Sequence, residues 1–396
     1  MEEDVENDTS SNYTLVQEVL SEPQFLSIVK HIHDTKVSNL SLLCIQVEDS
    51  TSHLFGKLVT DLHNTHVTKL ALVGNHLRDA FLVHYIQGLV HVTDLNLSYN
   101  EFTSRGWRAL MCALPKSKIE ALTWSGYSTW TMSDMRAFSR RASKCKLRVL
   151  RMQQCTWTLD TWTYFCTVVL PKLKNTLSRL DVSRSRFPDD FAKIFAERAL
   201  PHLVNLRHLD WNGNDCSSSI LNGIRLTTSL RRVALEIHIV HNSMYHLLES
   251  DHLTELDLVD CVGSVALSDW IGSIIQQKRW VALRVKRCNF GSAEAILHGI
   301  QNSTSLQLVE WEHATDHVEP FSTDVWFNAI RAHASLRCLR LAPWKEENAR
   351  LGSHLKRLRS TELKSLMVIL HHRATGKDLL STVPTELWRV LYEFML

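Results

Sequence analysis

The segment VTDLNLSYNEF at residues 92–102 sets the pattern of the whole chain, and VTKLALVGNHL at residues 67–77 repeats it 25 residues earlier. In both segments, apolar residues occupy the first, fourth, sixth and eleventh positions, and an asparagine occupies the ninth. The first positions of thirteen such copies are Val37, Val67, Val92, Ile119, Leu147, Leu177, Leu206, Leu230, Leu253, Trp280, Leu306, Leu336 and Leu363. The mean interval is about 27 residues, and a period of this size predicts a solenoid of stacked units.

Each copy is expected to contain a strand followed by a helix. The fourth and sixth positions alternate with outward-facing ones, which is typical of a strand with one buried face. After Asn100, apolar residues recur at the spacing of one helix face, as Trp107, Leu110, Met111 and Leu114. Alternating strands and helices predict an α/β fold with a parallel sheet on the concave side and helices on the convex side. The expected architecture is a right-handed, horseshoe-shaped solenoid of about 13 repeats.

The stretch from Leu95 to Leu114 resembles the ribonuclease-inhibitor-like subfamily of leucine-rich repeats, whose units have roughly 28 residues and a full helix. The resemblance extends over about residues 37–370. It is weaker in three copies, whose ninth position holds Tyr127, His238 and Ala314. A solenoid offers a long curved surface rather than one deep pocket, so the expected function is to bind another macromolecule.

Composition narrows the classes of function. The 396 residues exceed the usual single-core limit of roughly 250–300 residues, yet no linker rich in glycine or proline divides them. The net charge of +2 gives no reason to expect a nucleic-acid partner. The chain opens Met1-Glu2-Glu3-Asp4, acidic where a secretory leader is basic, and no apolar run reaches the roughly 18 residues of a membrane span. We therefore expect a monomer without membrane attachment.

The nine cysteines are scattered and form no Cys-x-x-Cys pair. Cys155, Cys261 and Cys288 fall on the ninth position of their copies, where a small side chain fits a buried turn. Free thiols on structural positions predict a reducing compartment, the cytoplasm, with the nucleus as the alternative.

The pattern also sets the expected segments of the chain. Residues 1–12 form a disordered acidic tail, and residues 13–36 form an N-terminal helical cap. The repeat domain occupies residues 37–375, and residues 376–396 form a C-terminal capping helix or an F-box-like segment.

The outward positions of the middle strands are the expected partner-binding surface. They carry Asp181, His208, Asp210, Asn212, Glu236, Glu255, Asp257, Arg284 and Lys286. Strands lie about 5 Å apart, so the carboxylates are expected to form an acidic ladder that would attract a basic partner. The alternative is that these residues are only the solvated face of a sheet.

Most of the twelve tryptophans and the histidine clusters receive structural interpretations. Trp107, Trp124, Trp157, Trp211 and Trp311 fall on inward positions and are expected in the core. The densest histidine cluster, His238, His241 and His246, lacks the rest of a zinc motif, so no metal is expected. No phosphate-binding loop, nucleophile elbow or His-Glu-x-x-His motif is found. The sequence therefore predicts a non-enzymatic protein without a cofactor.

The C-terminal segment from Val383 to Leu396 resembles the opening of an F-box, which docks on a ubiquitin-ligase adaptor. The residues that carry the resemblance are Pro384, Glu386, Leu387, Val390, Leu391 and Phe394. An F-box has roughly 45 residues and usually precedes the repeats, so a capping helix over the last repeat is the alternative.

Three functions follow from these patterns. The leading one is a non-enzymatic scaffold that binds a partner protein on its concave face. The second is a substrate-recruiting F-box-type subunit of a cullin–RING ubiquitin ligase. The third is a small-GTPase regulator, because Ran GTPase activators are similar to this chain in the repeats; they carry a long acidic C-terminal tail, whereas this chain ends in apolar residues.

Overall fold

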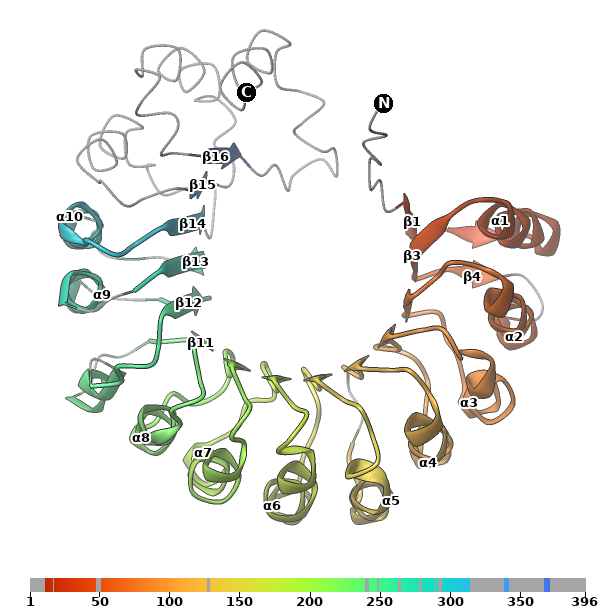
Figure 1. The fold of residues 1–396 in the computed structure, drawn as a ribbon, viewed down its shortest axis with the longest axis horizontal. Helices are drawn as coiled ribbons and strands as arrows, with labels where there is room; N and C mark the ends of the chain where they lie inside the picture. Colours follow the sequence, from red (N-terminus) through yellow and green to blue (C-terminus); the bar gives the residue numbers. More distant parts are fainter. Residues whose placement is uncertain are drawn as a thin grey trace, which may run out of the picture. The chain divides into compact units, whose positions relative to one another are not determined.

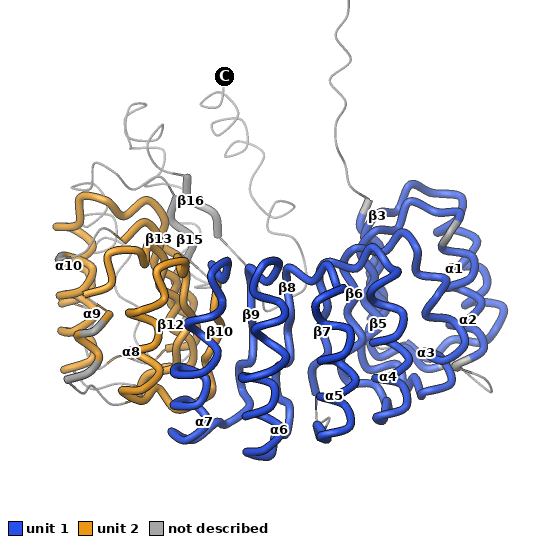
Figure 2. Tube along the Cα trace, turned by 60° about the horizontal axis from the view of Figure 1, so that its bottom comes forward, with its two compact units in different colours: residues 1–207 blue, residues 208–396 orange. Residues whose placement is uncertain are grey.

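The computed structural model describes residues 11–16, 18–47, 51–126, 129–238, 242–247, 249–262, 265–277, 280–288, 290, 294–313, 338–341 and 367–370. The chain forms two compact units, residues 1–207 and 208–396, here called the N-terminal and C-terminal units (Figure 2). In each unit parallel strands form one layer and helices form the other (Figure 1). The predicted α/β fold with a parallel sheet is confirmed.

The strands of each unit follow one another in the sheet in chain order. In the N-terminal unit they are β1 (Ser11–Val16), β3 (Val37–Leu43), β5 (Lys69–Val73), β6 (Asp94–Asn96), β7 (Ala121–Thr123), β8 (Val149–Arg151) and β9 (Arg179–Asp181). In the C-terminal unit they are β10 (His208–Asp210), β11 (Arg232–Leu235), β12 (Glu255–Val259), β13 (Ala282–Cys288), β14 (Leu308–His313), β15 (Cys338–Leu341) and β16 (Met367–Leu370). A separate two-stranded sheet joins β2 (Val19–Leu20) and β4 (Gln46–Val47).

The helices cover one side of each sheet. They are α1 (Glu22–Asp34), α2 (Thr51–Asp61), α3 (Asp79–Tyr85), α4 (Ser104–Ala113), α5 (Met132–Ala142), α6 (Leu159–Tyr164), α7 (Asp189–Ile194), α8 (Ser218–Leu226), α9 (Val265–Gln277) and α10 (Glu294–Asn302). Short 3₁₀ turns are η1 (Leu62–Asn64), η2 (Ile86–Gly88), η3 (Leu114–Lys116), η5 (Leu170–Leu173), η7 (Leu200–His202) and η8 (Asn242–Leu247). The segments η4 (Phe165–Val169) and η6 (Phe195–Ala199) are π-helical turns.

The start and end of these helices follow from local sequence. Thr131 caps α5, because its hydroxyl accepts a hydrogen bond from the backbone N–H of Asp134 at 3.2 Å. The sequence Leu-Pro ends three of the helical segments, at Pro115, Pro171 and Pro201, each of which opens a 3₁₀ turn. Proline has no N–H to continue an α-helix, so the chain leaves the helix there.

The register confirms the positions inferred from the repeat. Residues at the fourth position pair from strand to neighbouring strand within each unit. In the N-terminal unit these residues are Leu40, Leu70, Leu95, Leu122, Leu150 and Leu180. In the C-terminal unit they are Leu209, Val233, Leu256, Leu283, Val309 and Leu339.

The core lies between the sheet and the helices. The tryptophans assigned to inward positions, Trp107, Trp124, Trp157, Trp211 and Trp311, are all buried, as predicted. Aromatic rings from successive copies meet in this layer. Trp107 and Trp130 pack edge to face with ring centroids 4.6 Å apart, and Trp162 lies 4.2 Å from Phe187.

One backbone feature recurs at the eighth position of the copies, where the chain leaves the strand. There the φ angle is positive, which is the left-handed region. The residues are Cys44, Gly74, Tyr99, Gly126, Gln154, Arg184, Gly213, Asp260 and Arg287. Only three of them are glycine, although the left-handed region costs other residues about 1–2 kcal/mol. The turn is therefore imposed by the surrounding structure and not by residue type.

The ninth position supplies a buried side chain that bonds to this turn. The Asn75 amide Oδ1 accepts a hydrogen bond from the backbone N–H of Ile45 at 2.7 Å, and its Nδ2 donates to the carbonyl of Leu42 at 2.9 Å. Asn100 does the same for the next turn, accepting from the backbone N–H of Asn75 at 3.0 Å and donating to the carbonyl of Leu72 at 2.7 Å. Each side chain thus satisfies backbone groups of the preceding copy.

Cysteine takes this position in other copies, as predicted. The Cys261 N–H donates to Cys288 Sγ at 3.3 Å, and Cys288 Sγ donates to the carbonyl of Leu258 at 3.4 Å. Cys155 Sγ lies 3.5 Å from the carbonyl of Trp124. Burial raises the pKa of the Cys155 thiol to about 12, so this thiol stays protonated and can donate.

The copy that begins at Leu230 is one residue shorter than the repeat predicts. Its ninth position was assigned to His238, but the buried residue whose N–H donates to Cys261 Sγ, at 3.3 Å, is Ile237. His238 is exposed. Among the residues that the structure describes, this copy has no positive φ angle before Ile237, because the residue that would adopt it is missing.

The register also differs in the last copy. Counting from Leu363 would pair Leu366 with Leu339, but the structure pairs Val368 with Leu339. The strand therefore comes two residues later than predicted.

The N-terminal segment differs from the predicted helical cap. Ser11 and Asn12, assigned to the tail, and residues 13–16, assigned to a helix, form β1, which pairs in parallel with β3. Tyr13 and Leu15 are half-buried and alternate with exposed neighbours, which is the period of a strand.

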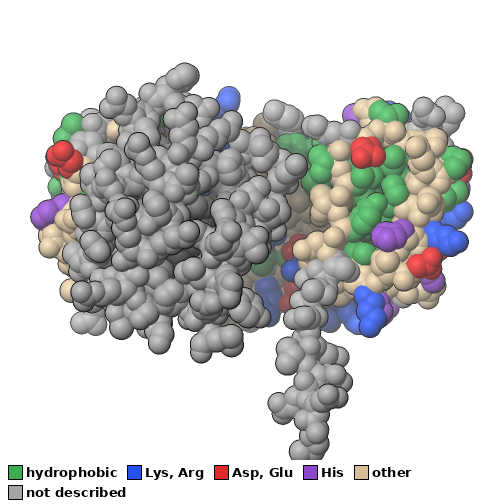
Figure 3. Space-filling model, turned by 90° about the horizontal axis from the view of Figure 1, so that it is seen from above, with side chains coloured by type: hydrophobic (Ala, Val, Ile, Leu, Met, Phe, Trp, Pro, Cys, Tyr) green, Lys and Arg blue, Asp and Glu red, His purple; other side chains and the backbone are tan. Residues whose placement is uncertain are grey.

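The helix of this segment, α1, begins only at Glu22, and Pro23 lies in its first turn, where proline is favoured. Phe25 of α1 packs edge to face on Phe55 of α2 with ring centroids 5.0 Å apart. Figure 3 shows apolar side chains at the surface of one face of the molecule. At this end of the chain, Val16 and Val19 are 49% and 66% exposed. No helix in the described ranges is long and apolar enough to cross a membrane.

Replacing Leu95 with alanine tests the register. Leu95 is fully buried at the fourth position of its copy, so its truncation should lower the free energy of unfolding by roughly 2–5 kcal/mol. Chemical denaturation measures this change. The neighbouring half-exposed Asp94 is the matched control, and its replacement with alanine should cost less than about 1 kcal/mol. Equal losses from the two variants would show that the side chain at position 95 does not point into the core.

Replacing Asn75 with alanine tests the ladder of buried side chains. The change leaves two buried backbone groups, the N–H of Ile45 and the carbonyl of Leu42, without their partner. We expect the free energy of unfolding to fall by about 2–4 kcal/mol. Replacement of the exposed Asn175 should have almost no effect, and thermal unfolding of both variants provides the comparison. A stability loss at residue 75 no larger than at residue 175 would contradict the role given to the amide.

Candidate protein-binding surface

The outward-facing residues of β10 to β14 lie in rows across the sheet of the C-terminal unit. The parallel register places His208 beside Arg232 and Arg232 beside Glu255. A second row contains Asp257, Arg284 and Glu310 in neighbouring strands. In a third row, Lys286 lies beside Glu312. Basic and acidic side chains therefore alternate in the second row and pair in the third, whereas the first row places His208 beside Arg232.

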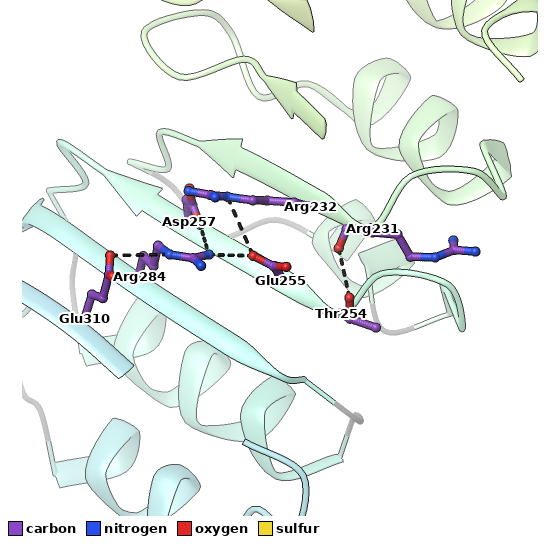
Figure 4. Close-up of polar contacts among 7 residues, drawn as sticks. All are labelled: Arg231, Arg232, Thr254, Glu255, Asp257, Arg284 and Glu310. Carbon is purple, nitrogen blue, oxygen red and sulfur yellow. Dashed lines mark hydrogen bonds and ion pairs between the residues drawn. The ribbon is translucent and has the colours of Figure 1, made fainter. Parts of the chain in front are cut away.

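Arg284 is the centre of a network of ion pairs on this face (Figure 4). Its Nη1 donates to Glu255 Oε2 at 2.7 Å and to Asp257 Oδ1 at 3.2 Å. Its Nε lies 3.3 Å from Glu310 Oε2 on the other side. One guanidinium group thus links three carboxylates from β12 and β14, which its planar set of donors makes possible.

Arg232 closes the network from β11. Its Nε donates to Asp257 Oδ2 at 2.9 Å, and the same atom lies 3.9 Å from Glu255 Oε2. Nη2 of Arg232 also donates to Asp257 Oδ2. Asp257 therefore binds two guanidinium groups, one from each neighbouring strand (Figure 4).

The network is partly shielded from solvent. The side chains of Asp257 and Arg284 are 6% and 13% exposed, whereas those of Arg232 and Glu255 are 25% and 32% exposed. Burial alone would lower the pKa of Arg284. The hydrogen bond to Glu255 and the charges of Asp257, Glu255 and Glu310 outweigh this effect, and the pKa is raised. The guanidinium group is thus fixed in its charged form.

The predicted acidic ladder is corrected by this geometry. Glu255 and Asp257 do lie side by side, but Arg232 and Arg284 lie between and beside them and balance much of their charge. Two like charges on adjacent residues of one strand face repel each other, and the two arginines remove that repulsion. What remains is an excess of acidic groups. Six carboxylates, Asp210, Glu236, Glu255, Asp257, Glu310 and Glu312, share this face with three basic groups, Arg232, Arg284 and Lys286.

The other predicted site residues have different surroundings. Asp181 belongs to the N-terminal unit and is buried, and its Oδ1 accepts hydrogen bonds from the N–H of Ser183 at 3.1 Å and its hydroxyl at 2.7 Å. Its role is structural. Asn212 is also buried. Glu236 accepts a hydrogen bond from the exposed His238 at 2.7 Å and lies after the end of β11.

Sequence reasoning missed Arg232, Glu310 and Glu312. Arg232 is the third residue of the copy that begins at Leu230, and Glu310 and Glu312 are the fifth and seventh residues of the copy that begins at Leu306. These are the outward positions from which the other candidates were chosen. Applying the rule to every copy would have found all three.

Two further predictions concern metal and the C-terminal segment. Within the described residues, no group of histidine, cysteine, aspartate or glutamate side chains is arranged to hold a metal ion. The F-box-like residues Pro384, Glu386, Leu387, Val390, Leu391 and Phe394 lie outside the residues that the structure describes.

No protein-family profile matches this sequence, and comparison with curated proteins finds no match.

Truncating Asp257 tests the network. Asp257→Ala leaves two guanidinium groups without their shared carboxylate on a partly buried face, so the free energy of unfolding should fall by about 2–4 kcal/mol. Glu236→Ala is the matched control, because Glu236 bonds only to an exposed histidine among the contacts described, and it should cost less than about 1 kcal/mol. Urea denaturation measures the free energy of unfolding of both variants. An equal loss in Glu236→Ala and Asp257→Ala would contradict the stabilising role given to the Arg232 and Arg284 network.

Proposed function

We propose that this chain is a non-enzymatic scaffold that binds a partner protein on the sheet face of β10 to β14. The underlying fold would be a right-handed leucine-rich-repeat solenoid of about 13 copies, with this face on its concave side. Three observations support the repeat: the parallel register, the positive φ angle at the eighth position, and the buried polar or thiol side chain at the ninth.

The network around Arg284 is the observation that carries the proposal. Exposed ion pairs contribute little to stability because ordering two long side chains costs conformational entropy. On this face five charged side chains already hold one another in place; they are Arg232, Glu255, Asp257, Arg284 and Glu310. A partner that bonds to them would not have to order them first, so less binding free energy would be lost.

The charge balance indicates the partner's chemistry. The face has an excess of three carboxylates, and Glu255 and Glu310 keep part of their surface in solvent. A lysine or arginine of the partner would extend the alternation of charges that the strands begin. Opposite charge would speed the encounter and fix its orientation.

Recognition fits these side chains better than proton transfer does. A carboxylate that is already bonded to two guanidinium groups, as Asp257 is, would have to break those bonds to accept a proton. The buried cysteines that act as hydrogen-bonding groups at the ninth position support a reducing compartment, for which we propose the cytoplasm.

Neutralising Glu255 and Glu310 together tests the proposal. The Glu255 side chain is 32% exposed and that of Glu310 is 16% exposed. Glutamine has nearly the same shape and keeps an oxygen that can accept from Arg284, so the double variant should keep the fold, which circular dichroism checks. Immobilised wild-type protein should retain at least one partner from a lysate of the source cell at 100 mM salt or thereabouts, and the double variant should retain it about tenfold less.

The control replaces Asp160 and Asp190 with asparagine, because both are exposed on helices rather than on the sheet. It carries the same change of charge. Equal recovery of every captured protein by all three samples would overturn the assignment of this face.

A further inference from the structure

The loops that lead from helix to strand carry a concentrated positive charge in the second half of the N-terminal unit. Four segments, residues 114–120, 140–148, 170–178 and 197–207, are called here the basic rim. They contain Lys116, Lys118, Arg140, Arg141, Lys144, Lys146, Arg148, Lys172, Lys174, Arg198 and Arg207. All eleven are exposed, and the same segments hold only two acidic residues, Glu120 and Glu197.

Backbone hydrogen bonds hold these loops side by side. The N–H of Arg148 donates to the carbonyl of Glu120 at 2.7 Å, that of Ser178 to Arg148 at 2.8 Å, and that of Arg207 to Ser178 at 2.8 Å. On the helix side, Lys172 Nζ donates to the carbonyl of Ser139 at 2.9 Å, which ties neighbouring helix ends together. The four segments therefore form one continuous edge.

Most of the basic side chains of this edge have no polar partner among the residues that the structure describes. The Nη1 atom of Arg148 lies 3.7 Å from Oε2 of Glu120, and Nζ of Lys172 donates hydrogen bonds to Ser139. In the part of the chain that the structure describes, the side chains of the other nine form no ion pair or hydrogen bond. The loop after α8 differs. Its Arg225 pairs with Glu249 at 3.6 Å, and its Arg231 donates to the carbonyl of Thr228 at 2.7 Å.

Stabilisation of helix ends does not explain the rim. Cations in the last turn of a helix interact favourably with its dipole, which accounts for one or two per helix. Lys118, Lys144 and Lys146 lie beyond the last turn of their helices. Placing like charges in adjacent loops destabilises the folded chain through repulsion, so a ligand of opposite charge would relieve a cost that the fold itself does not offset.

We propose that the basic rim binds a short acidic segment of a partner protein. The rim has a net charge of +9, whereas the whole chain has +2, so all remaining residues together carry −7. Positive charge is thus segregated into four neighbouring loops. This surface is distinct from the sheet face of β10 to β14, and the proposal does not depend on the function assigned to that face.

The dimensions of the rim favour a peptide. Neighbouring strands lie about 5 Å apart and packed helices about 8–10 Å apart, so four loops extend over roughly 15–30 Å. Every second side chain of an extended peptide recurs at about 7 Å, which lets acidic residues meet a cation in each loop.

A nucleic acid or a membrane fits less well. None of the four segments contains a phenylalanine, tyrosine or tryptophan on which an unpaired base could stack. A long duplex or a lipid surface would also extend beyond the rim. The described residues of the N-terminal unit outside the rim carry 13 basic and 12 acidic side chains, so they would add little attraction for a polyanion. Val204, which is 60% exposed, offers a small apolar contact that a peptide side chain can use.

Fluorescence anisotropy with a labelled peptide of alternating glutamate and serine, about 16 residues long, tests the proposal on the full chain. We expect saturable binding that weakens as salt increases. The variant with Arg140, Lys144 and Lys146 changed to glutamine should bind the peptide about tenfold more weakly. The control variant changes the exposed Lys30, Lys57 and Arg105, which lie outside the rim, and should stay within about twofold of wild type.

Two outcomes would overturn the proposal. One is equal weakening by the two variants, which would mean that the peptide responds to overall charge. The other is tighter binding of a duplex DNA of about 20 base pairs, or of phosphatidylserine vesicles, than of the peptide, with the loss confined to the rim variant. Circular dichroism and thermal unfolding verify that each variant remains folded, so a loss of binding reflects the surface.

Discussion

The rest of the structure depends on how the chain leaves each strand. A short parallel strand must end in a turn, and that turn has backbone groups that no neighbouring strand satisfies. In this chain the eighth residue adopts a positive φ angle, and the ninth places a buried side chain against the turn of the preceding copy. The same side chain thus completes one copy and joins it to the next. Because each copy contacts mainly its neighbours, this contact joins the copies wherever the ninth position holds such a side chain, as at Asn75, Asn100 and Cys288.

The chemistry of the ninth position is broader than asparagine. The amide of Asn75 both accepts and donates, and the thiol of Cys288 reproduces both bonds with longer distances. The side chain of Ile237 can do neither. Its backbone N–H still donates to Cys261 Sγ of the next copy, as the N–H of Asn75 donates to Asn100. The backbone N–H of each of these ninth residues needs an acceptor, and the side chain at the ninth position of the following copy supplies it. The residue that donates this N–H can itself be apolar, as Ile237 is.

These particulars show why some features were predictable and others were not. Burial of Leu95, Trp211 and Cys261 follows from position in the repeat alone, because the period fixes which side chains point inward. The one-residue deletion before Ile237 could not be recognised from the sequence, because several apolar residues lie close together there and each could occupy the same position of the repeat. The strand at β1 could have been recognised, since Tyr13 and Leu15 alternate with exposed residues. A helix was preferred because the adjoining segment has helical spacing.

The candidate surface was predictable in place but not in charge. Alternation along a strand predicts that Glu255 and Asp257 point away from the core, but it does not predict which side chains of the neighbouring strands contact them. The strand register determines these contacts, and it places Arg232 and Arg284 on either side of Asp257. The burial of Asp257 then follows from its neighbours, because two long guanidinium side chains cover it.

The distribution of charge has one more physical consequence. On the sheet face of the C-terminal unit, opposite charges are paired at strand spacing and partly neutralise one another, so the proposed partner would have to match the pattern at short range. On the basic rim, like charges gather without neutralisation, so attraction extends to about a Debye length, or 8 Å at physiological salt. The first arrangement favours discrimination between partners, and the second favours rapid capture. The proposed scaffold, which would hold proteins without transforming them, could use both arrangements, because a charge pattern needs only a rigid surface and stacked copies provide one.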